Sequence, residues 1–231
     1  MARHPPRAIP ELVATGPGQV YSWDITKLAG PIKGTYFDCY VMIDIFSRYI
    51  VGADVHASES GRLAAEMMKE IFGIHGTPQV VHADRGTSMT SKTVATLLSD
   101  LEVTKSHSRP RVSNDNPFSE AWFKTLKFAP RVPGTLRLRG RPRAFMANFV
   151  EGYNHTHRNT GIGLNTPADV HYGLAAAKSV ERSAILAAAR ARNPERFGTA
   201  NNSKILALSG TNWIDKPAEQ LVEETDPKPA A

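Results

Sequence analysis

Three carboxylates in the sequence stand where the local pattern does not favour one. Asp24 falls within an apolar segment that predicts a β-strand, where aspartate is disfavoured. Asp84 directly follows the apolar run that ends at Ala83, and sites in α/β sheets gather at strand ends of this kind. Glu120 lies in the opening turns of a predicted helix, with 35 residues between it and Asp84. These three residues are the candidates for chemistry.

The chemistry available to them depends on whether the two strands are neighbours. If they are, Asp24 and Asp84 come side by side, and two carboxylates so close repel each other unless a cation neutralises them. Glu120, on a helix over the strand ends, would complete a set of oxygen ligands that suits Mg²⁺ or Mn²⁺ better than Zn²⁺. Two such ions about 3.5–4 Å apart can activate a water or a 3′-hydroxyl for attack on a phosphodiester.

Each carboxylate taken singly also has a structural explanation. Asp24 could be an edge or strand-end acid, Asp84 a turn former, and Glu120 an acid favoured by the helix dipole. Asp44 shows the same ambiguity, because it too interrupts an apolar run. We interpret Asp44 as structural, hydrogen-bonded to the turn at residues 47–48.

The helix that carries Glu120 has a clear start. Asn116 suits its N-cap, and Pro117 suits its first position, where the missing N–H costs nothing. At helical spacing, one face of this helix carries Glu120, Lys124 and Lys127. The neighbouring face carries the aromatic rings of Phe118 and Trp122. A surface helix with an intrahelical Glu–Lys pair is the simpler interpretation of this pattern.

Hydrophobic periodicity and chain breakers predict the elements that position these residues. We expect strands at residues 19–28, 35–46, 49–55, 78–83 and 102–107, and helices at 59–72, 90–101 and from 117 onward. Ser58 is the expected cap of the first helix and Gly73 its end. This order predicts an α/β, ribonuclease H-like fold, with a mixed five-stranded sheet and helices on both faces.

The rest of the chain divides around this core. We expect an irregular leader over residues 1–18, a core domain over 19–173, and a helical extension over 174–231 that ends in a disordered tail from Asp215. Helical patterns continue at residues 144–153 and 167–192, and little periodicity follows residue 193.

Charge and composition indicate the class of partner. The 231 residues carry a formal net charge of +6, and residues 121–150 contain seven Lys or Arg but no Asp or Glu. Such a cluster is typical of nucleic-acid binding, although a solvated basic loop would look the same. The single cysteine, Cys39, allows no internal disulfide and suits a reducing, cytoplasmic environment. No secretory signal or transmembrane segment is predicted.

Four motifs in order resemble the DDE integrase core of bacterial insertion-sequence transposases, which are kin of retroviral integrases. The resemblance covers residues 18–173 and rests on these motifs: Trp23-Asp24-Ile25-Thr26, His82-Ala83-Asp84-Arg85-Gly86, Asp115 to Glu120 with Lys124 and Lys127, and a post-catalytic segment of Tyr153 to Arg158, Gly161 to Leu164 and Thr166 to Asp169. Ala83 departs from the serine that relatives often have before the second aspartate.

The resemblance implies roles for particular residues. Asp24, Asp84 and Glu120 become a catalytic triad that binds Mg²⁺ or Mn²⁺, with two ions expected. The implied reaction is hydrolysis at transposon ends, followed by attack of the freed 3′-hydroxyl on target DNA, by a homo-oligomer assembled on DNA. The candidate DNA contacts are Lys124, Lys127, Arg131 and Arg158.

Two other functions remain open from the sequence. Full-length relatives carry upstream helix-turn-helix regions, and none is visible here, so the chain could be a truncated product that binds DNA without transposing. A separate helix-turn-helix protein encoded upstream is then a possible partner. Another ribonuclease H-like nuclease is the second alternative, and the post-catalytic segment at residues 153–169 argues against it.

Overall fold

The fold is built on a mixed five-stranded sheet. The computed structural model describes residues 9–30, 32–109, 115–128, 142–197 and 205–217. The strands of the sheet lie in the order β4-β3-β2-β5-β6. Their bounds are β2 (Val20–Ala29), β3 (Tyr36–Asp44), β4 (Ile50–His56), β5 (Val80–Ala83) and β6 (Thr104–His107). Strands β2, β3 and β4 form an antiparallel meander, whereas β5 pairs in parallel with both β2 and β6. This is the predicted ribonuclease H-like arrangement.

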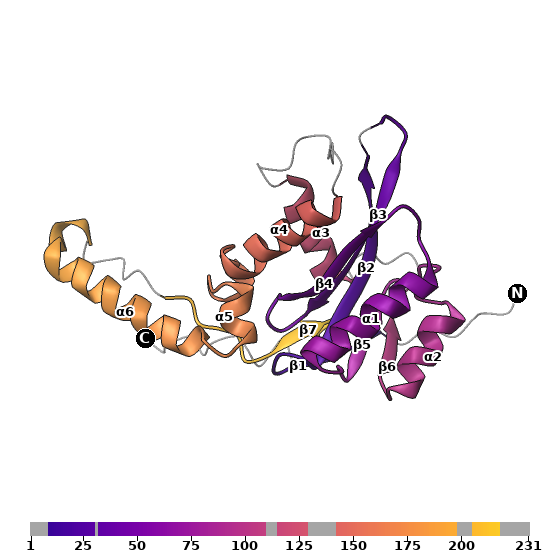
Figure 1. The fold of residues 1–231 in the computed structure, drawn as a ribbon. Helices are drawn as coiled ribbons and strands as arrows, with labels where there is room; N and C mark the ends of the chain where they lie inside the picture. Colours follow the sequence, from indigo (N-terminus) through magenta and orange to yellow (C-terminus); the bar gives the residue numbers. More distant parts are fainter. Residues whose placement is uncertain (1–8, 31, 110–114, 129–141, 198–204, 218–231) are drawn as a thin grey trace, which may run out of the picture.

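Helices cover both faces of the sheet (Figure 1). The helices that follow the meander are α1 (Gly61–His75), α2 (Lys92–Asp100), α3 (Pro117–Phe128) and α4 (Pro142–His155). The first two pack with Tyr21 and Trp23 in one buried cluster. The other two pack with Cys39 and Val41 in a second cluster on the opposite face. The alternation of side chains along a strand divides the residues between these clusters.

Two helices follow the covered sheet. They are the short α5 (Pro167–His171) and α6 (Ala175–Arg192), which extends away from the sheet (Figure 1). A capping box between Thr166 and Asp169 starts α5. Gly173 separates the two helices with a positive φ of 73°. None of the described helices is long and apolar enough to cross a membrane.

Several local predictions are confirmed and others are wrong. Asp44 accepts hydrogen bonds from the N–H and hydroxyl of Ser47, as predicted for the turn. The cap of α1 is Ser60 rather than Ser58. That helix continues through Gly73 to Gly76, where a φ of 86° ends it.

A second, two-stranded sheet was not predicted. Strand β1 (Leu12–Ala14) lies in the segment expected to be an irregular leader, and it pairs antiparallel with β7 (Asn212–Ile214). Residues 212–214 therefore lie beside residues 12–14, near the other end of the sequence. The expected disordered tail, except for residues 215–217, lies outside the described residues, and the proposed division into three regions stays a prediction.

Candidate active site

Two of the three candidate carboxylates lie at the ends of neighbouring parallel strands. The register pairs Trp23 on β2 with Ala83 on β5, so Asp24 and Asp84 are the next residues along each strand. Both line a pocket of about 90 Å³, and Asp84 is exposed at its edge. The sequence placed Asp24 beside Asp84 only if their two strands were neighbours, and the strands are neighbours. A larger cavity of about 450 Å³, between β4 and α1, contains none of the predicted site residues.

Electrostatics show that the third carboxylate is near. Burial, followed by the negative charges of Asp84 and Glu120, raises the pKa of Asp24 to about 7. A hydrogen bond from the Ile25 N–H and the positive charge of Lys127 oppose this shift in pKa without cancelling it. The site is therefore a cluster of negative charge that the surrounding residues leave largely uncompensated.

Glu120 does not complete a closed set of ligands in this arrangement. Across the described parts of the chain, no group of three or more His, Cys, Asp and Glu side chains is placed to hold a metal ion. Glu120 is half-buried in the first turn of α3, and its carboxylate makes no hydrogen bond or ion pair with another described residue. The predicted Glu120–Lys124 ion pair of a simple surface helix is not formed.

Hydroxyl groups fix the loop that carries Asp84. The Ser108 hydroxyl donates to the Asp84 carboxylate from the end of β6. On the other side of the loop, Glu59 accepts hydrogen bonds from the Thr87 hydroxyl and from the N–H and hydroxyl of Ser88, at 2.7 to 3.0 Å. The Thr87 hydroxyl is the main cause that lowers the pKa of Glu59. Glu59 lines the same pocket as the two aspartates, so it is a fourth carboxylate at the site.

Buried polar side chains attach the start of α3 to the centre of the sheet. The Ser22 hydroxyl bonds the Asn116 side chain and the Ser119 hydroxyl, at 2.5 and 2.8 Å. The Asn116 amide also donates to the Trp23 carbonyl. Asn116 therefore reaches across to β2, and the structure records no N-cap bond from its side chain. Because Ser22 and Asp24 are two residues apart on β2, this attachment holds α3 over the strand end.

A second attachment holds the residue that precedes α3. His82 on β5 donates from Nε2 to the Asp115 carbonyl, at 2.8 Å. Arg109 binds the Asp115 carboxylate through its backbone N–H, its Nε and its Nη2, at 2.7 to 2.9 Å. Burial lowers the pKa of His82 and so favours its neutral ring, with the proton on Nε2 for this bond.

The two lysines on α3 differ in their surroundings. Lys127 donates to the Thr26 hydroxyl and lies 5.8 Å from the centre of the Phe123 ring. Lys124 is exposed and has no hydrogen bond or ion pair with any residue that the structure describes. Trp122, only 1% exposed, packs α3 against the sheet.

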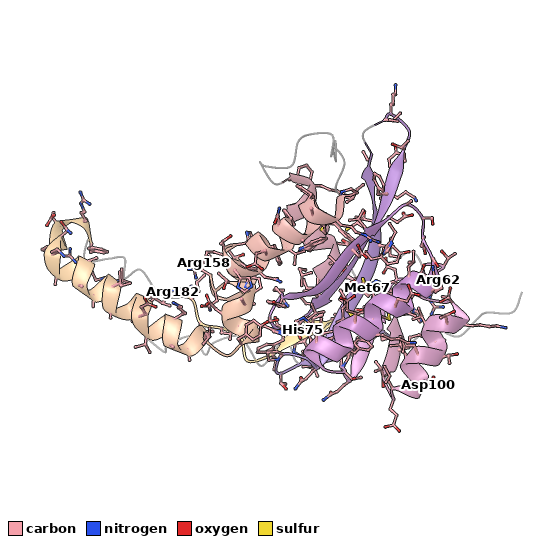
Figure 2. The ribbon with its side chains drawn as sticks, viewed as in Figure 1. Arg62, Met67, His75, Asp100, Arg158 and Arg182 are labelled. Carbon is pink, nitrogen blue, oxygen red and sulfur yellow. The ribbon has the colours of Figure 1, made fainter. Side chains whose placement is uncertain are left out.

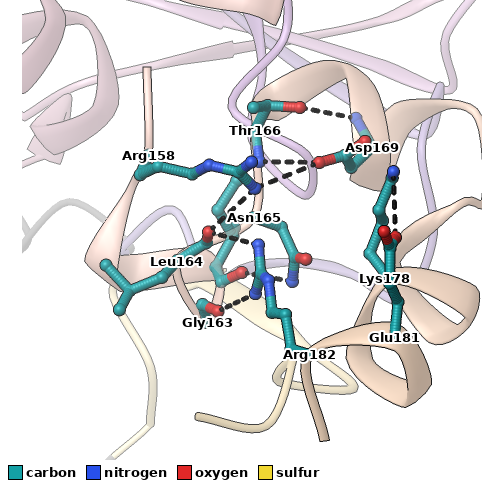
Figure 3. A network of polar contacts seen from close by, with 10 residues as sticks. Arg158, Gly163, Leu164, Asn165, Thr166, Asp169, Lys178, Glu181 and Arg182 are labelled. Atoms are coloured by element: carbon teal, nitrogen blue, oxygen red, sulfur yellow. Dashed lines mark hydrogen bonds and ion pairs between the residues drawn. The ribbon is translucent and has the colours of Figure 1, made fainter. Parts of the chain in front are cut away.

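Arg158 lies with the turn before α5, in the region that Figure 2 labels. Its guanidinium is 3.5 Å from both the Asp169 carboxylate and the Leu164 carbonyl. Arg182 of α6 donates to the carbonyls of Gly163 and Leu164 in the same network (Figure 3). The post-catalytic motif thus joins α4, α5 and α6, and a DNA contact by Arg158 stays a prediction. Arg131 lies outside the described residues.

Sequence reasoning missed the residues that position the site. Three of them, Ser22, His82 and Asp115, are completely buried polar residues. They position the site through hydrogen bonds to partners 33 to 97 residues away in the sequence. The available signals were the polarity of Ser22 and His82 within apolar segments and the presence of His82 and Asp115 in the quoted motifs. Glu59 had no signal, because it lies in a polar turn between β4 and α1.

Comparison with known proteins finds similar sequences. Residues 14–113 match the family model of the integrase core domain. That match covers the five strands of the ribonuclease H-like sheet together with α1 and α2. It is 29% identical over 159 residues to the transposase for insertion sequence element IS904 of Lactococcus lactis, covering 68% of this chain and 62% of that relative. The chain thus spans less than two thirds of the relative's length.

Solved structures share the fold at low sequence identity. A chain of the simian T-cell lymphotropic virus intasome, in complex with a PP2A regulatory subunit, aligns with a TM-score of 0.55 at 17% identity, over 69% of this chain and 56% of that one. The HTLV-2 integrase catalytic core domain in complex with magnesium, in its trimeric form, aligns with a TM-score of 0.50 at 15% identity, over 68% and 97% of the two chains.

Proposed function

We propose that this chain is the catalytic core of an insertion-sequence transposase of the DDE type. It would cleave DNA at transposon ends and join the freed 3′-hydroxyl to target DNA. The observation that carries the proposal is the β2–β5 register, which aligns Asp24 with Asp84, and the negative charge of Glu120 on α3 contributes to the raised pKa of Asp24. The similarity to an insertion-sequence transposase supports the same function.

The donor set fits Mg²⁺ or Mn²⁺ and supports a proposal that two ions bind. All three candidate ligands are carboxylate oxygens, and their mutual repulsion favours a divalent cation. A structural neighbour is a catalytic core in complex with magnesium. Divalent ions at such sites supply Lewis-acid activation of the attacking oxygen and stabilisation of the leaving oxygen.

The chain's own residues would prepare this site. Asp24 must lose its proton to act as a ligand, and its pKa of about 7 allows this at neutral pH. Ser108 holds the Asp84 carboxylate in place. The Glu120 carboxylate must come closer to the aspartates, and its freedom from hydrogen bonds among the described residues permits that movement. Lys124 and Lys127 would contact DNA phosphates beside the site.

Nicking of supercoiled plasmid DNA in MgCl₂ or MnCl₂ tests the proposal. We expect metal-dependent nicking by the wild-type protein and a loss of at least about 100-fold in Asp84→Asn and Glu120→Gln. Glu70→Gln, which changes an exposed carboxylate on α1, is the matched control and should retain full activity. Unchanged nicking by both site variants would refute the assignment. Salt-dependent DNA binding without nicking by the wild type would favour the degenerate, DNA-binding alternative.

The partners belong to the same proposal. DNA ends and target DNA are the proposed substrates, and a homo-oligomer on DNA is the proposed working form. A structural neighbour is part of an assembled intasome. Recognition of the transposon ends by a separate helix-turn-helix protein is the remaining proposal, and addition of that protein to the nicking reaction tests it.

A further inference from the structure

The segment that returns from α6 to the core ends beside the start of α3. We call residues 205–215 the C-terminal strap. It passes close to the turn at Gly163, where there is no room for a side chain. A Cβ added to Gly163 would lie 2.7 and 3.1 Å from the carbonyl oxygens of Leu206 and Ala207. Its last residues form β7, and Ile214 is completely buried in a cluster against which Phe118 of α3 also packs. The strap is thus part of the packing around α3.

One contact links the strap to the first turn of α3. The Asn212 side-chain oxygen accepts a hydrogen bond of 2.8 Å from Arg48 Nη2. The guanidinium of Arg48 lies over the Phe118 ring, 4.1 Å from its centre. Such a cation–π contact restricts both groups, and Phe118 is only two residues before Glu120. Asn212 therefore acts on the helix start through Arg48.

A second contact links the strap to Asp115, just before α3. The Asp215 carboxylate is 3.7 Å from Arg109 Nη2. The same guanidinium binds the Asp115 carboxylate at 2.8 Å. Asp115 precedes the first helical residue by two positions, so the strap reaches both sides of the helix start through two arginines.

We propose that the C-terminal strap positions α3 and, through it, Glu120. Asn212 and Asp215 hold Arg48 and Arg109, which in turn hold Phe118 and Asp115. Glu120 has no side-chain hydrogen bond or ion pair within the described structure, so the backbone of α3 sets its location. The helix keeps its Ser22 attachment without the strap, so losing these two contacts should loosen the helix start and leave the fold intact. The link to catalysis rests on the proposed function.

Hydrogen–deuterium exchange in the metal-free protein tests the structural half of this inference. The double variant N212A/D215N removes both strap contacts, and asparagine tolerates the left-handed backbone of residue 215, where φ is 53°. We expect amides of residues 117–124 to exchange about fivefold faster or more, with amides of α1 and β3 unchanged. Glu181→Ala, which breaks an exposed ion pair on α6, is the control and should leave α3 unchanged. Unchanged exchange in α3, or an equal increase throughout the protein, would overturn the proposal.

Steady-state nicking of supercoiled plasmid DNA tests the catalytic half. The double variant should show a kcat at least about fivefold lower, with KM unchanged. A displaced Glu120 would reduce stabilisation of the transition state without affecting DNA binding. An unchanged kcat despite faster exchange in α3 would refute the link to catalysis. If the wild type shows no metal-dependent nicking, the proposed function fails, and the exchange result still decides whether the strap positions α3.

Discussion

Ionisation of Asp24, which metal binding requires, lowers the stability of the folded protein. Its carboxylate is drawn into the sheet beside two other negative charges, and its pKa rises from 3.8 to about 7. The free energy of unfolding therefore falls as the pH rises from about 4 to 7, because the unfolded chain ionises Asp24 more readily than the folded chain does.

Asp24→Asn should stabilise the metal-free protein above pH 7. Asparagine keeps an oxygen that can accept the Ile25 N–H and removes the buried charge. We expect an increase in the free energy of unfolding on the order of 1–4 kcal/mol at pH 8, shrinking toward zero near pH 4. Urea unfolding in EDTA at the two pH values measures it. A gain of the same size at both pH values would show that charge is not the cause.

Lys124→Ala should weaken DNA binding without affecting stability. Lys124 is exposed on the Glu120 face, and it makes no hydrogen bond or ion pair with a described residue. Loss of one phosphate contact should reduce the slope of log Kd against log salt by about one. Fluorescence anisotropy with a labelled duplex over a range of KCl concentrations measures this slope. Lys69→Ala, an exposed lysine on the opposite face of the sheet, is the control. Equal effects of the two substitutions would place DNA elsewhere.

At the scale of elements, α3 depends on its polar attachment to β2. Ser22→Ala leaves the Asn116 and Ser119 side chains without their shared partner in a buried place. We expect a loss of about 1–3 kcal/mol in the free energy of unfolding, measured by urea unfolding. Ser183→Ala on the exposed face of α6 should change it by less than about 0.5 kcal/mol. A loss no larger than that of the control would mean that apolar packing alone holds α3.

The elements of the core could be predicted because their patterns are local. Strand β2 has the alternation and helix α1 the apolar stripe that identify each type, and both were predicted within a few residues. The limits of α1 were wrong because Ser58 and Ser60 are equally suitable caps by type, and only the path of the chain selects Ser60. The attachment of Asn116 to β2 required knowledge of which strand lies beneath α3.

At the scale of the whole molecule, the sheet lies between two layers of helices, and the aspartates lie at the ends of its central strands. Glu120 and Lys124 belong to α3 on one face, whereas α1 and α2 cover the other face, and Glu59 reaches the site from the start of α1. The alignment of Asp24 with Asp84 could be anticipated from the fold, since strand ends meet at one edge. The β1–β7 sheet could not be predicted from the sequence, because it joins two three-residue strands about 200 residues apart. Short pairings of this kind leave no periodic signal.

The central claim is that Asp24 and Asp84, with Glu120, bind divalent cations. Calorimetric titration of EDTA-treated protein with MnCl₂ at pH 8 tests it without requiring DNA or the correct transposon ends. We predict saturable binding by the wild type and by Glu70→Gln, and loss of that binding in the double variant D24N/D84N, with the variant still folded by circular dichroism. Binding of Mn²⁺ by D24N/D84N with the affinity of the wild type would contradict the account.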